Sequence, residues 1–277
     1  MADTMVYLKE AVDADGAYLG QLSLASGKLC RHPGHGAKRA GWNLGYEAML
    51  EKIRAKLAGR PFLLLDEGCC DRLGAALDGQ LTAMLGRVDS GAFPEMYRYT
   101  FPHQPLLEMM NPASSVMRCP RLGRLSAALL MRAFILGQYL WVYDLEEDNT
   151  FRADGEERAF LHKVVSLRRA WLRAYGPGRF LDDRGMAFPA GSLMAGGVEA
   201  KLFGLRDGLL IAAANPAGRA DLTVRLAGGF PVGSVAMRTL EAPGEERFWD
   251  FEREGETVRI QLPPSGLSLA VFRQAEA

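Results

Sequence analysis

Phe62-Leu-Leu-Leu-Asp-Glu-Gly68 is the stretch from which the fold can be inferred, because four apolar residues end abruptly in two acids and a glycine. An apolar run without polar alternation is typical of a strand buried on both faces of a parallel sheet. The glycine lets the backbone turn directly after the acids. The stretch therefore predicts a parallel strand that carries Asp66 and Glu67 at its carboxyl end.

On both sides of this strand, as far as residue 178, short apolar runs alternate with stretches of helical periodicity. This alternation is the signature of parallel βα units, and four such units make half of an eight-stranded barrel. The sequence therefore predicts an α/β fold, a partial (β/α)8 TIM barrel that comprises about the last half of the barrel. The expected strands are 16–22, 62–65, 95–101 and 139–143, and the expected helices are 5–12, 44–57, 71–85, 121–137 and 156–175.

The last third of the chain has a different pattern. Gly176-Pro-Gly178 ends the preceding helix, and apolar residues then recur with a period near two between turn sequences. We therefore expect two domains: residues 1–178 form the half-barrel of catalytic type, and residues 186–277 form a C-terminal antiparallel β-sandwich. The expected sandwich strands are 201–205, 209–215, 222–226, 235–240, 258–262 and 267–272.

A half-barrel has open strand edges, which a complete barrel removes by closure. Two arrangements would complete it. The favoured one is a missing N-terminal half, so that the chain is a truncated form of a longer protein. The other is a homo-oligomer in which copies of the chain complete one another.

Charge and hydropathy exclude some partners. Lys and Arg number 33, as do Asp and Glu, and no basic run occurs, so we expect neither nucleic acid nor an anionic membrane as partner. The apolar stretches 127–130 and 133–136 are too short to span a bilayer. Residues 1–6 lack the pattern of a secretory signal, so the chain as written is expected to be cytoplasmic, an inference that a missing N-terminal segment would remove.

No cofactor is expected, because the sequence contains no P-loop, GxGxxG, GxSxG or HExxH motif. Cys30, His32 and His35 have a spacing that suits metal ligands, but no fourth ligand lies nearby, so we expect no metal. The alternatives for this segment are a loop over the functional site and a loop of structural role only.

Five motifs follow one another along the chain. They are Asp15-Gly-Ala-Tyr-Leu-Gly-Gln21, Cys30-Arg-His-Pro-Gly-His-Gly36, Trp42-Asn-Leu-Gly-Tyr46, Leu65-Asp-Glu-Gly68 and Tyr97-Arg-Tyr-Thr-Phe-Pro102. In this order they resemble a group of bacterial TIM-barrel proteins related to glycoside hydrolases that carry the DUF6259 domain. The resemblance covers nearly the whole chain but only the second half of that family's barrel. It implies action on a carbohydrate substrate and a terminal β-sandwich.

Two acids are the candidate catalytic residues. Glu67 ends an apolar strand, where barrel enzymes place catalytic groups, and is expected to act as the general acid/base; capping the next helix or pairing with Arg72 is the alternative. Asp66, Asp144 and Glu146 are the candidates for the second carboxylate that glycoside hydrolysis needs, and Asp144, at the end of the fourth expected strand, is the preferred one. Asp66 points away from Glu67 in a regular strand and is expected to be structural.

Polar and aromatic residues near strand ends are the expected substrate contacts. Aromatic rings pack on the apolar faces of sugars, and polar groups bind the hydroxyls. The alternative for the aromatic residues is a place in the core. The expected substrate-binding residues are Gln21, His32, His35, Trp42, Tyr97, Arg98 and His103.

Gly20 is the one departure from the family's pattern, which has D-G-x-Y-L-D-Q where this chain has Asp15-Gly-Ala-Tyr-Leu-Gly-Gln21. If the family's aspartate is essential, its loss leaves a protein that binds sugar without cleaving it. The sequence therefore predicts a glycoside-hydrolase-like protein with carboxylate acid/base catalysis. The alternatives are a non-catalytic glycan-binding pseudoenzyme and an inactive fragment.

Overall fold

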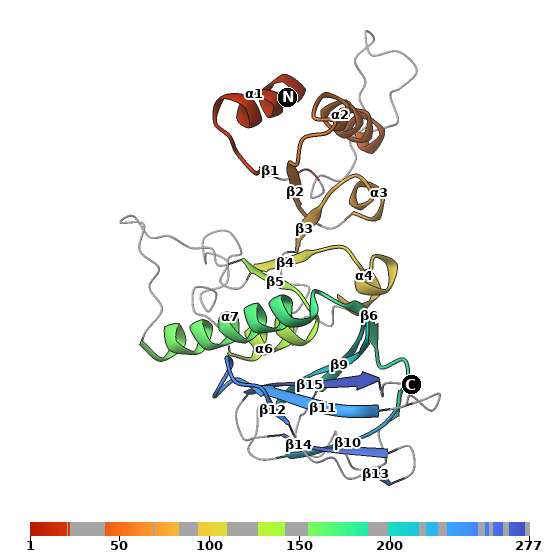
Figure 1. The fold of residues 1–277 in the computed structure, drawn as a ribbon. Coiled ribbons are helices and arrows are strands. Elements are labelled where there is room, and N and C mark those ends of the chain that lie inside the picture. Colours follow the sequence, from red (N-terminus) through yellow and green to blue (C-terminus); the bar gives the residue numbers. More distant parts are fainter. Residues whose placement is uncertain are drawn as a thin grey trace. The chain divides into compact units, whose positions relative to one another are not determined.

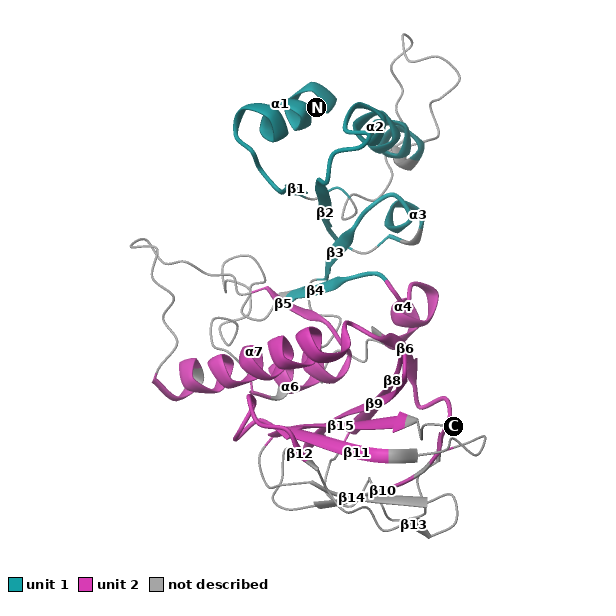
Figure 2. Cartoon of the chain, viewed as in Figure 1, with its two compact units in different colours: residues 1–83, 104–109 teal, residues 84–103, 110–277 magenta. Residues whose placement is uncertain are grey.

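The computed structural model describes most of the chain: residues 1–20, 22, 42–68, 70–82, 94–109, 127–141, 155–187, 199–215, 220–226, 232–248, 253–254, 257–262 and 266–274. The chain divides into two compact units (Figure 2). Unit 1 comprises Met1–Ala83 with Gln104–Met109, and unit 2 comprises Met84–His103 with Met110–Ala277. Each unit has hydrophobic clusters of its own.

Unit 1 is a parallel sheet with helices (Figure 1). Its four strands are hydrogen-bonded in chain order, which is the arrangement that the alternation of strands and helices predicts. The strands are β1 (Gly16–Leu19), β2 (Leu63–Glu67), β3 (Gly79–Thr82) and β4 (Leu106–Met109), and the helices are α1 (Ala2–Ala11), α2 (Trp42–Lys56) and α3 (Asp71–Gly74).

The two faces of β2 differ in exposure. Leu64 is fully buried in a cluster with Leu50 and Ile53 of α2, whereas the adjacent Leu63 is 53% exposed. Because side chains alternate along a strand, Leu64 and Asp66 lie on the helix-covered face and Leu63, Leu65 and Glu67 lie on the other. Glu67 therefore points away from the helices, as the sequence predicts from the regular alternation.

Polar side chains are buried on the helix-covered face. Asp66 of β2 pairs in register with Gln80 of β3, and Thr82 of β3 pairs with Glu108 of β4. All four side chains are almost completely buried. The Thr82 hydroxyl bonds with the Glu108 carboxylate and lies 3.1 Å from the Leu107 carbonyl oxygen. The strands β3 and β4 are thus held by side-chain hydrogen bonds as well as by their backbone pairing.

Arg54 joins α2 to the sheet. Its guanidinium donates to the Phe62 carbonyl oxygen at 3.0 Å and to the Asp78 carboxylate at 2.5 Å. The same Asp78 oxygen accepts the Leu64 backbone N–H at 2.7 Å. Asp78 therefore links the helix to both β2 and the start of β3.

Unit 2 has three layers, which are a helical layer, a six-stranded antiparallel sheet and a second, smaller sheet (Figure 1). The sheet order is β12-β11-β15-β9-β8-β6, and a second sheet has the order β13-β14-β10-β7. The helices are α4 (Pro94–Thr100), α6 (Ala127–Ile135) and α7 (Gly155–Tyr175), and the strands are β5 (Tyr139–Trp141), β6 (Arg179–Asp182), β7 (Met186–Ala187), β8 (Glu199–Leu205), β9 (Gly208–Asn215), β10 (Ala220–Leu226), β11 (Val232–Thr239), β12 (Arg247–Phe248), β13 (Arg253–Glu254), β14 (Thr257–Leu262) and β15 (Gly266–Gln274).

The six-stranded sheet is buried on both faces. Leu210 of β9 packs in one cluster with Phe134 of α6 and Trp171 of α7. Its neighbour Ile211 points to the opposite face, into a second cluster with Val224 of β10. Helices therefore cover one face of the sheet, and the second sheet covers the other.

The shared core explains where the compact units divide. The sequence prediction separates residues 1–178 from residues 186–277, whereas the compact units divide after Ala83. Because α6 and α7 bury their apolar faces on the sheet of the sandwich, these helices belong to the same compact unit as the strands that follow them.

Several sequence predictions are confirmed at the level of elements. The expected strands around residues 16–19, 63–65 and 139–141 exist, as do the long helix ending at Tyr175 and the helix around α2. The six expected sandwich strands coincide with β8, β9, β10, β11, β14 and β15.

The predicted strand 95–101 is wrong, since residues 95–100 lie in helix α4. Pro94 is the first helical residue, a position where its fixed φ favours a helix, and Glu95 lies in the first turn, where a carboxylate is stabilised. The predicted helix 71–85 is also too long, because α3 ends at Gly74 and β3 begins at Gly79. The sequence analysis missed β3 and β4, which are four residues each and contain buried polar side chains.

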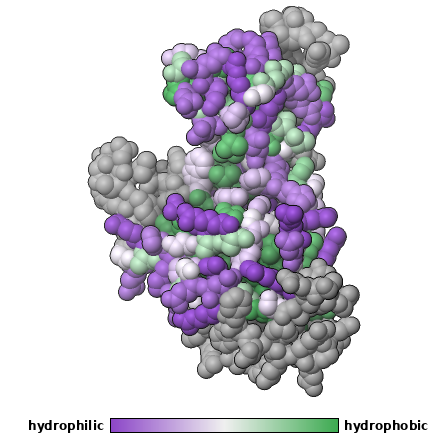
Figure 3. All heavy atoms as spheres, viewed as in Figure 1, coloured by the Kyte–Doolittle hydropathy of each residue, from purple (hydrophilic) through white to green (hydrophobic). Residues whose placement is uncertain are grey.

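The described part of the chain contains no helix long and apolar enough to cross a membrane. In the view of Figure 3, much of the described surface is hydrophilic, with smaller hydrophobic areas between. The hydrophobic side chains of both units are thus mainly used in their clusters.

Buried charges join α4 to the sandwich within unit 2. Lys201 of β8 lies 2.6 Å from the Asp182 carboxylate and 2.9 Å from that of Glu95. The Tyr99 hydroxyl donates to Asp182 at 2.7 Å. Asp182 has a φ of +57°, a left-handed conformation that costs free energy outside glycine, and these bonds help to hold it there.

We expect Asp78→Ala to destabilise the protein by about 1–3 kcal/mol, because the mutation removes the acceptor of both Arg54 and the Leu64 N–H. Urea unfolding measures the change. Glu10→Ala is the matched control, because Glu10 is an exposed acid paired only with Arg60 in the described contacts, and we expect no measurable shift of the midpoint. An equal shift in both variants would contradict the assigned role of Asp78.

Stability should fall as the pH rises from about 10 to about 12. Burial and the hydrogen bond to Asp182 raise the pKa of Tyr99 to about 12. Burial lowers the pKa of Lys201, but its bonds with Asp182 and Glu95 outweigh this effect and raise it overall. Both groups hold their protons more tightly when folded, so their contribution is complete below the unfolded pKa values and is lost above them.

Urea unfolding at several pH values between about 9 and 12 tests this loss. Tyr99→Phe removes the titrating hydroxyl, so the variant should lose less stability over that range than the parent protein. Tyr7→Phe, at an exposed position, is the control and should follow the parent curve. Parallel curves for all three proteins would show that Tyr99 does not contribute.

Candidate functional site

The carboxyl ends of β1 and β2 form the candidate site in unit 1. Ends of parallel strands lie at the same edge of a sheet, where α/β proteins bind their ligands. Leu19 pairs with Asp66, so the next residue on each strand, Gly20 and Glu67, are neighbours as well. Both lie on the face opposite the helices.

The space at Gly20 opens toward Glu67. Within the described part of the chain, a Cβ atom built on Gly20 would lie 3.9 Å from Oε2 of Glu67 and would meet no other atom within 4 Å. A short side chain fits there without a clash. An aspartate at position 20 would place a second carboxylate close to Glu67, and glycoside hydrolysis uses two carboxyl groups that flank the scissile bond.

Gly68 fixes the end of β2. Its φ is +95°, a region that residues with a side chain rarely adopt, and its N–H donates to the Leu81 carbonyl oxygen at 2.8 Å. The chain therefore turns directly after Glu67. The Glu67 carboxylate is left at the edge of the sheet, where its side chain is only partly buried.

An aromatic and aliphatic surface continues from Glu67 along the same face. Tyr18 lies two residues before Gly20 and pairs in register with Leu65. Tyr18 is 37% exposed. The sequence analysis did not select Tyr18, although the same alternation that places Gly20 beside Glu67 also places Tyr18 on this face.

The structure brings together only some of the predicted site residues. Glu67 and Gly20 are adjacent, while four predicted residues lie outside the described part of the chain. Trp42 is the first residue of α2, and its side chain is not among those described. The residues outside the described part are Gln21, His32, His35 and Asp144.

Tyr97, Arg98 and His103 belong to unit 2. The Arg98 guanidinium lies 5.2 Å from the centre of the Phe180 ring, and its burial lowers the pKa of Arg98 to about 10. Tyr97 packs on Phe101 with ring centres 5.1 Å apart, and His103 is exposed. Their contacts with substrate remain predictions.

A second buried cation, Arg168, was not selected from the sequence. Its guanidinium stacks on the rings of Phe134 and Trp171 at 4.4 and 4.2 Å from their centres. It donates to the carbonyl oxygens of Phe134, at 2.5 Å, and Gln138, at 3.4 Å, and burial lowers its pKa to about 9. These contacts hold the end of α6 against α7, which is a structural role.

Among the described residues, no group of three or more His, Cys, Asp or Glu side chains is arranged to hold a metal ion.

No family model matches the chain, and no curated protein matches it. Solved structures match its fold, and three of them are α-amylases. With the Anoxybacillus α-amylase the TM-score is 0.55 at 14% identity, covering 100% of this chain and 62% of that one. With the maltogenic α-amylase of Thermotoga neapolitana the TM-score is 0.60 at 13% identity, with 99% and 65% covered.

The α-amylase from H. orenii has a TM-score of 0.53 and 12% identity, and the match covers 98% of this chain and 64% of that one. The chain thus spans less than two thirds of the length of these three enzymes. The matches show a glycoside-hydrolase-like fold, which confirms that part of the predicted resemblance. The assignment to the DUF6259 group and the half-barrel remain predictions.

Gly68→Ala should destabilise the protein by roughly 1–3 kcal/mol, because an alanine at a φ of +95° is strained. Thermal and urea unfolding measure this change. Gly45→Ala on α2 is the control, since a Cβ there meets no atom of the described residues within 4 Å and alanine favours helices. If Gly68→Ala proved as stable as the parent protein, the turn after Glu67 would not require glycine.

Proposed function

We propose that the protein is a glycoside-hydrolase-like protein that acts on a carbohydrate, with Glu67 as its acid/base group. The observation that carries the proposal is the position of Glu67, partly exposed at the carboxyl end of β2 and beside the open space at Gly20. Barrel enzymes place catalytic groups at such strand ends. The glycoside-hydrolase-like fold supports a carbohydrate as substrate class.

In this proposal, Glu67 in its protonated form donates a proton to the glycosidic oxygen as the bond to the leaving group breaks. A carboxyl group is suited to this step because it can return to its ionised form and then activate water. The exposed ring of Tyr18 lies on the same face and supplies an apolar surface for a sugar ring.

Hydrolysis needs a second carboxylate opposite the proton donor. Gly20 has no side chain with which to supply it. Asp144 is the proposed second carboxylate, and Gln21, His32, His35, Trp42, Tyr97, Arg98 and His103 are the proposed substrate contacts. Neither a cofactor nor a metal ion takes part in this proposal.

The open space at Gly20 also favours a second candidate function, glycan binding without cleavage. A site that keeps Glu67 and the apolar surface but lacks a nearby carboxylate can bind a sugar through hydrogen bonds and packing. The two functions differ in whether the bound glycan is cleaved.

Further chain would complete the proposed barrel. β1 is the outermost strand of its sheet, and Leu63 and Tyr18 are exposed on the face that carries Glu67. A missing N-terminal half or a second copy of the chain would cover them. The intact mass of the protein from its source, with peptide mapping, tests the first arrangement, and the mass of the assembly in solution tests the second.

The function is tested by assaying binding and hydrolysis of a panel of oligosaccharides with α- and β-linkages. If the protein is an enzyme, Glu67→Gln should lower the rate about 10²–10⁴-fold, because the amide cannot transfer the proton. Glu51→Gln, the same change at an exposed position of α2, is the control and should leave the rate unchanged. Hydrolysis unaffected by Glu67→Gln would overturn the acid/base role.

Gly20→Asp separates the two candidate functions. If the parent protein binds a glycan without cleaving it and Gly20→Asp gains hydrolysis that Glu67→Gln abolishes, the site is a former catalytic site that lacks one carboxylate. If the parent protein already hydrolyses the glycan, the second carboxylate comes from elsewhere. Absence of both binding and hydrolysis across the panel would contradict a role in carbohydrate metabolism.

A further inference from the structure

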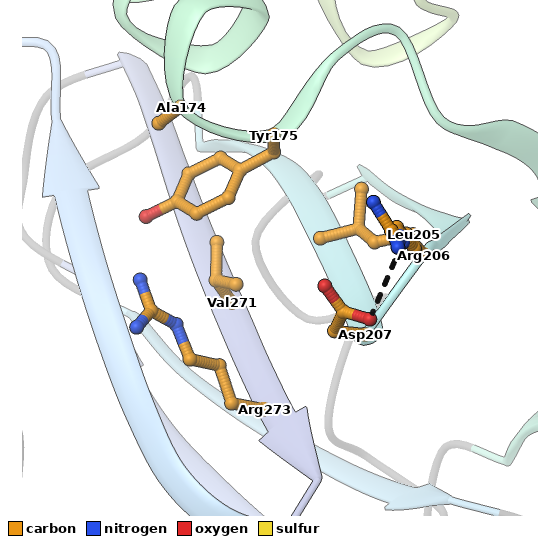
Figure 4. A pocket seen from close by; sticks show the side chains of 7 residues that line it. All are labelled: Ala174, Tyr175, Leu205, Arg206, Asp207, Val271 and Arg273. Carbon is orange, nitrogen blue, oxygen red and sulfur yellow. Dashed lines mark ion pairs between the residues drawn. The ribbon is translucent and has the colours of Figure 1, made fainter.

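A pocket of about 370 Å³ lies in unit 2, remote in sequence from Gly20 and Glu67. It forms where the last turn of α7 meets the turn between β8 and β9 and the strand β15 (Figure 4). Its volume falls within the range of about 300–1,000 Å³ that is usual for small-molecule sites. Its lining residues are Ala174, Tyr175, Leu205, Arg206, Asp207, Val271 and Arg273.

The interior of the pocket combines a fixed aromatic ring with aliphatic groups. Val271 is almost completely buried, and Leu205 is partly buried against the same cluster. The Tyr175 hydroxyl bonds with the Glu246 carboxylate, which fixes the orientation of the ring. Figure 4 shows the ring beside Val271, with Leu205 across the pocket.

Charged groups surround this apolar interior. Arg273 lies on one side, and Arg206 and Asp207 lie on the other, 3.9 Å apart (Figure 4). Gly208 follows them and pairs with Arg273. A Cβ at Gly208 would lie 2.2 Å from the Phe272 carbonyl oxygen, so glycine is required for this close approach of β9 and β15.

This combination suits a neutral ligand with many hydroxyl groups. A hydroxyl both donates and accepts, so it can donate to the Asp207 carboxylate and accept from the Arg273 guanidinium. The C–H face of a sugar ring packs on an aromatic ring and on aliphatic side chains. The pocket provides each of these partners within one small volume.

A compact anion fits the pocket less well. The Asp207 carboxylate repels it, and Arg206 already lies near that carboxylate. Ala174 and Tyr175 are at the end of α7, where the helix dipole is negative and disfavours anions. The two arginines alone therefore do not define a phosphate site.

We propose that this pocket binds one or two units of a neutral saccharide, as a site separate from Glu67. Tyr175 packs on the sugar ring, and Arg273 and Asp207 bind its hydroxyls. The proposal does not depend on catalysis by Glu67, since all the lining residues belong to unit 2.

The test uses the full chain and two probes, maltotriose and cellotriose, titrated separately while the methyl NMR signals of Val271 are followed. These signals report on the pocket itself, so binding elsewhere does not imitate the result. We expect saturable shifts with at least one probe. Arg273→Ala should weaken this binding about three- to tenfold, and Tyr175→Ala about tenfold or more.

Matched variants distinguish the pocket from the rest of the protein. Arg169→Ala removes an exposed arginine of α7 outside the pocket and should leave the dissociation constant unchanged. Tyr175→Phe keeps the ring but loses the bond with Glu246, so it should bind better than Tyr175→Ala; it also remains informative if Tyr175→Ala does not fold. Glu67→Gln should leave the Val271 shifts intact, whatever its effect on hydrolysis.

Three results would overturn the proposal. They are no shift of Val271 with either probe, shifts that Tyr175→Ala and Arg273→Ala leave unchanged, and shifts induced by inorganic phosphate but by neither saccharide. The last result would identify an anion site. Loss of hydrolysis in Glu67→Gln with unchanged Val271 shifts would support both functions independently.

Discussion

The in-register parallel pairing of β1 with β2 is the constraint on which the candidate site depends. The pairing of Leu19 with Asp66 places Gly20 beside Glu67, and the alternation of side chains turns both away from the helices. A shift of β2 by one residue would turn each of its side chains to the opposite face. Glu67 would then point toward the helices, and Leu64 would leave its cluster. Burial of Leu64 and the contacts of Asp78 with Arg54 and the Leu64 N–H oppose such a shift.

The elements that could be predicted are those whose own residue pattern identifies them, without their neighbours in space. The apolar run at β2 and the long amphipathic α7, ended by Gly176, are recognisable without knowledge of their neighbours. The strands β3 and β4 are not, because each is four residues long and carries buried polar side chains, such as Thr82, which bonds with Glu108 of the neighbouring strand. In α4, aromatic residues typical of strands gave the wrong prediction, whereas the proline at its start favours the helix.

The candidate site was predictable to the same extent. The position of Glu67 follows from the end of an apolar run, and the departure at Gly20 is visible in the sequence. The proximity of the two, and the exposed ring of Tyr18 on the same face, require the pairing of the strands. Arg98 was selected by its residue type and its place in the sequence, and the packing of its guanidinium on Phe180 could not be predicted from either. The pocket at Tyr175 joins residues from three distant segments, which no single motif could indicate.

The two covered faces of the six-stranded sheet have a consequence for how the protein can be divided. A chain cut between residues 178 and 186 would separate Trp171 and Phe134 from Phe203, Leu210 and Val271, with which they now share a core. The released strands would present a broad apolar face to water, and such faces drive aggregation. We therefore expect the strands of the sandwich to need helices α6 and α7 in order to fold, so that a module transferred by recombination would have to include both helices.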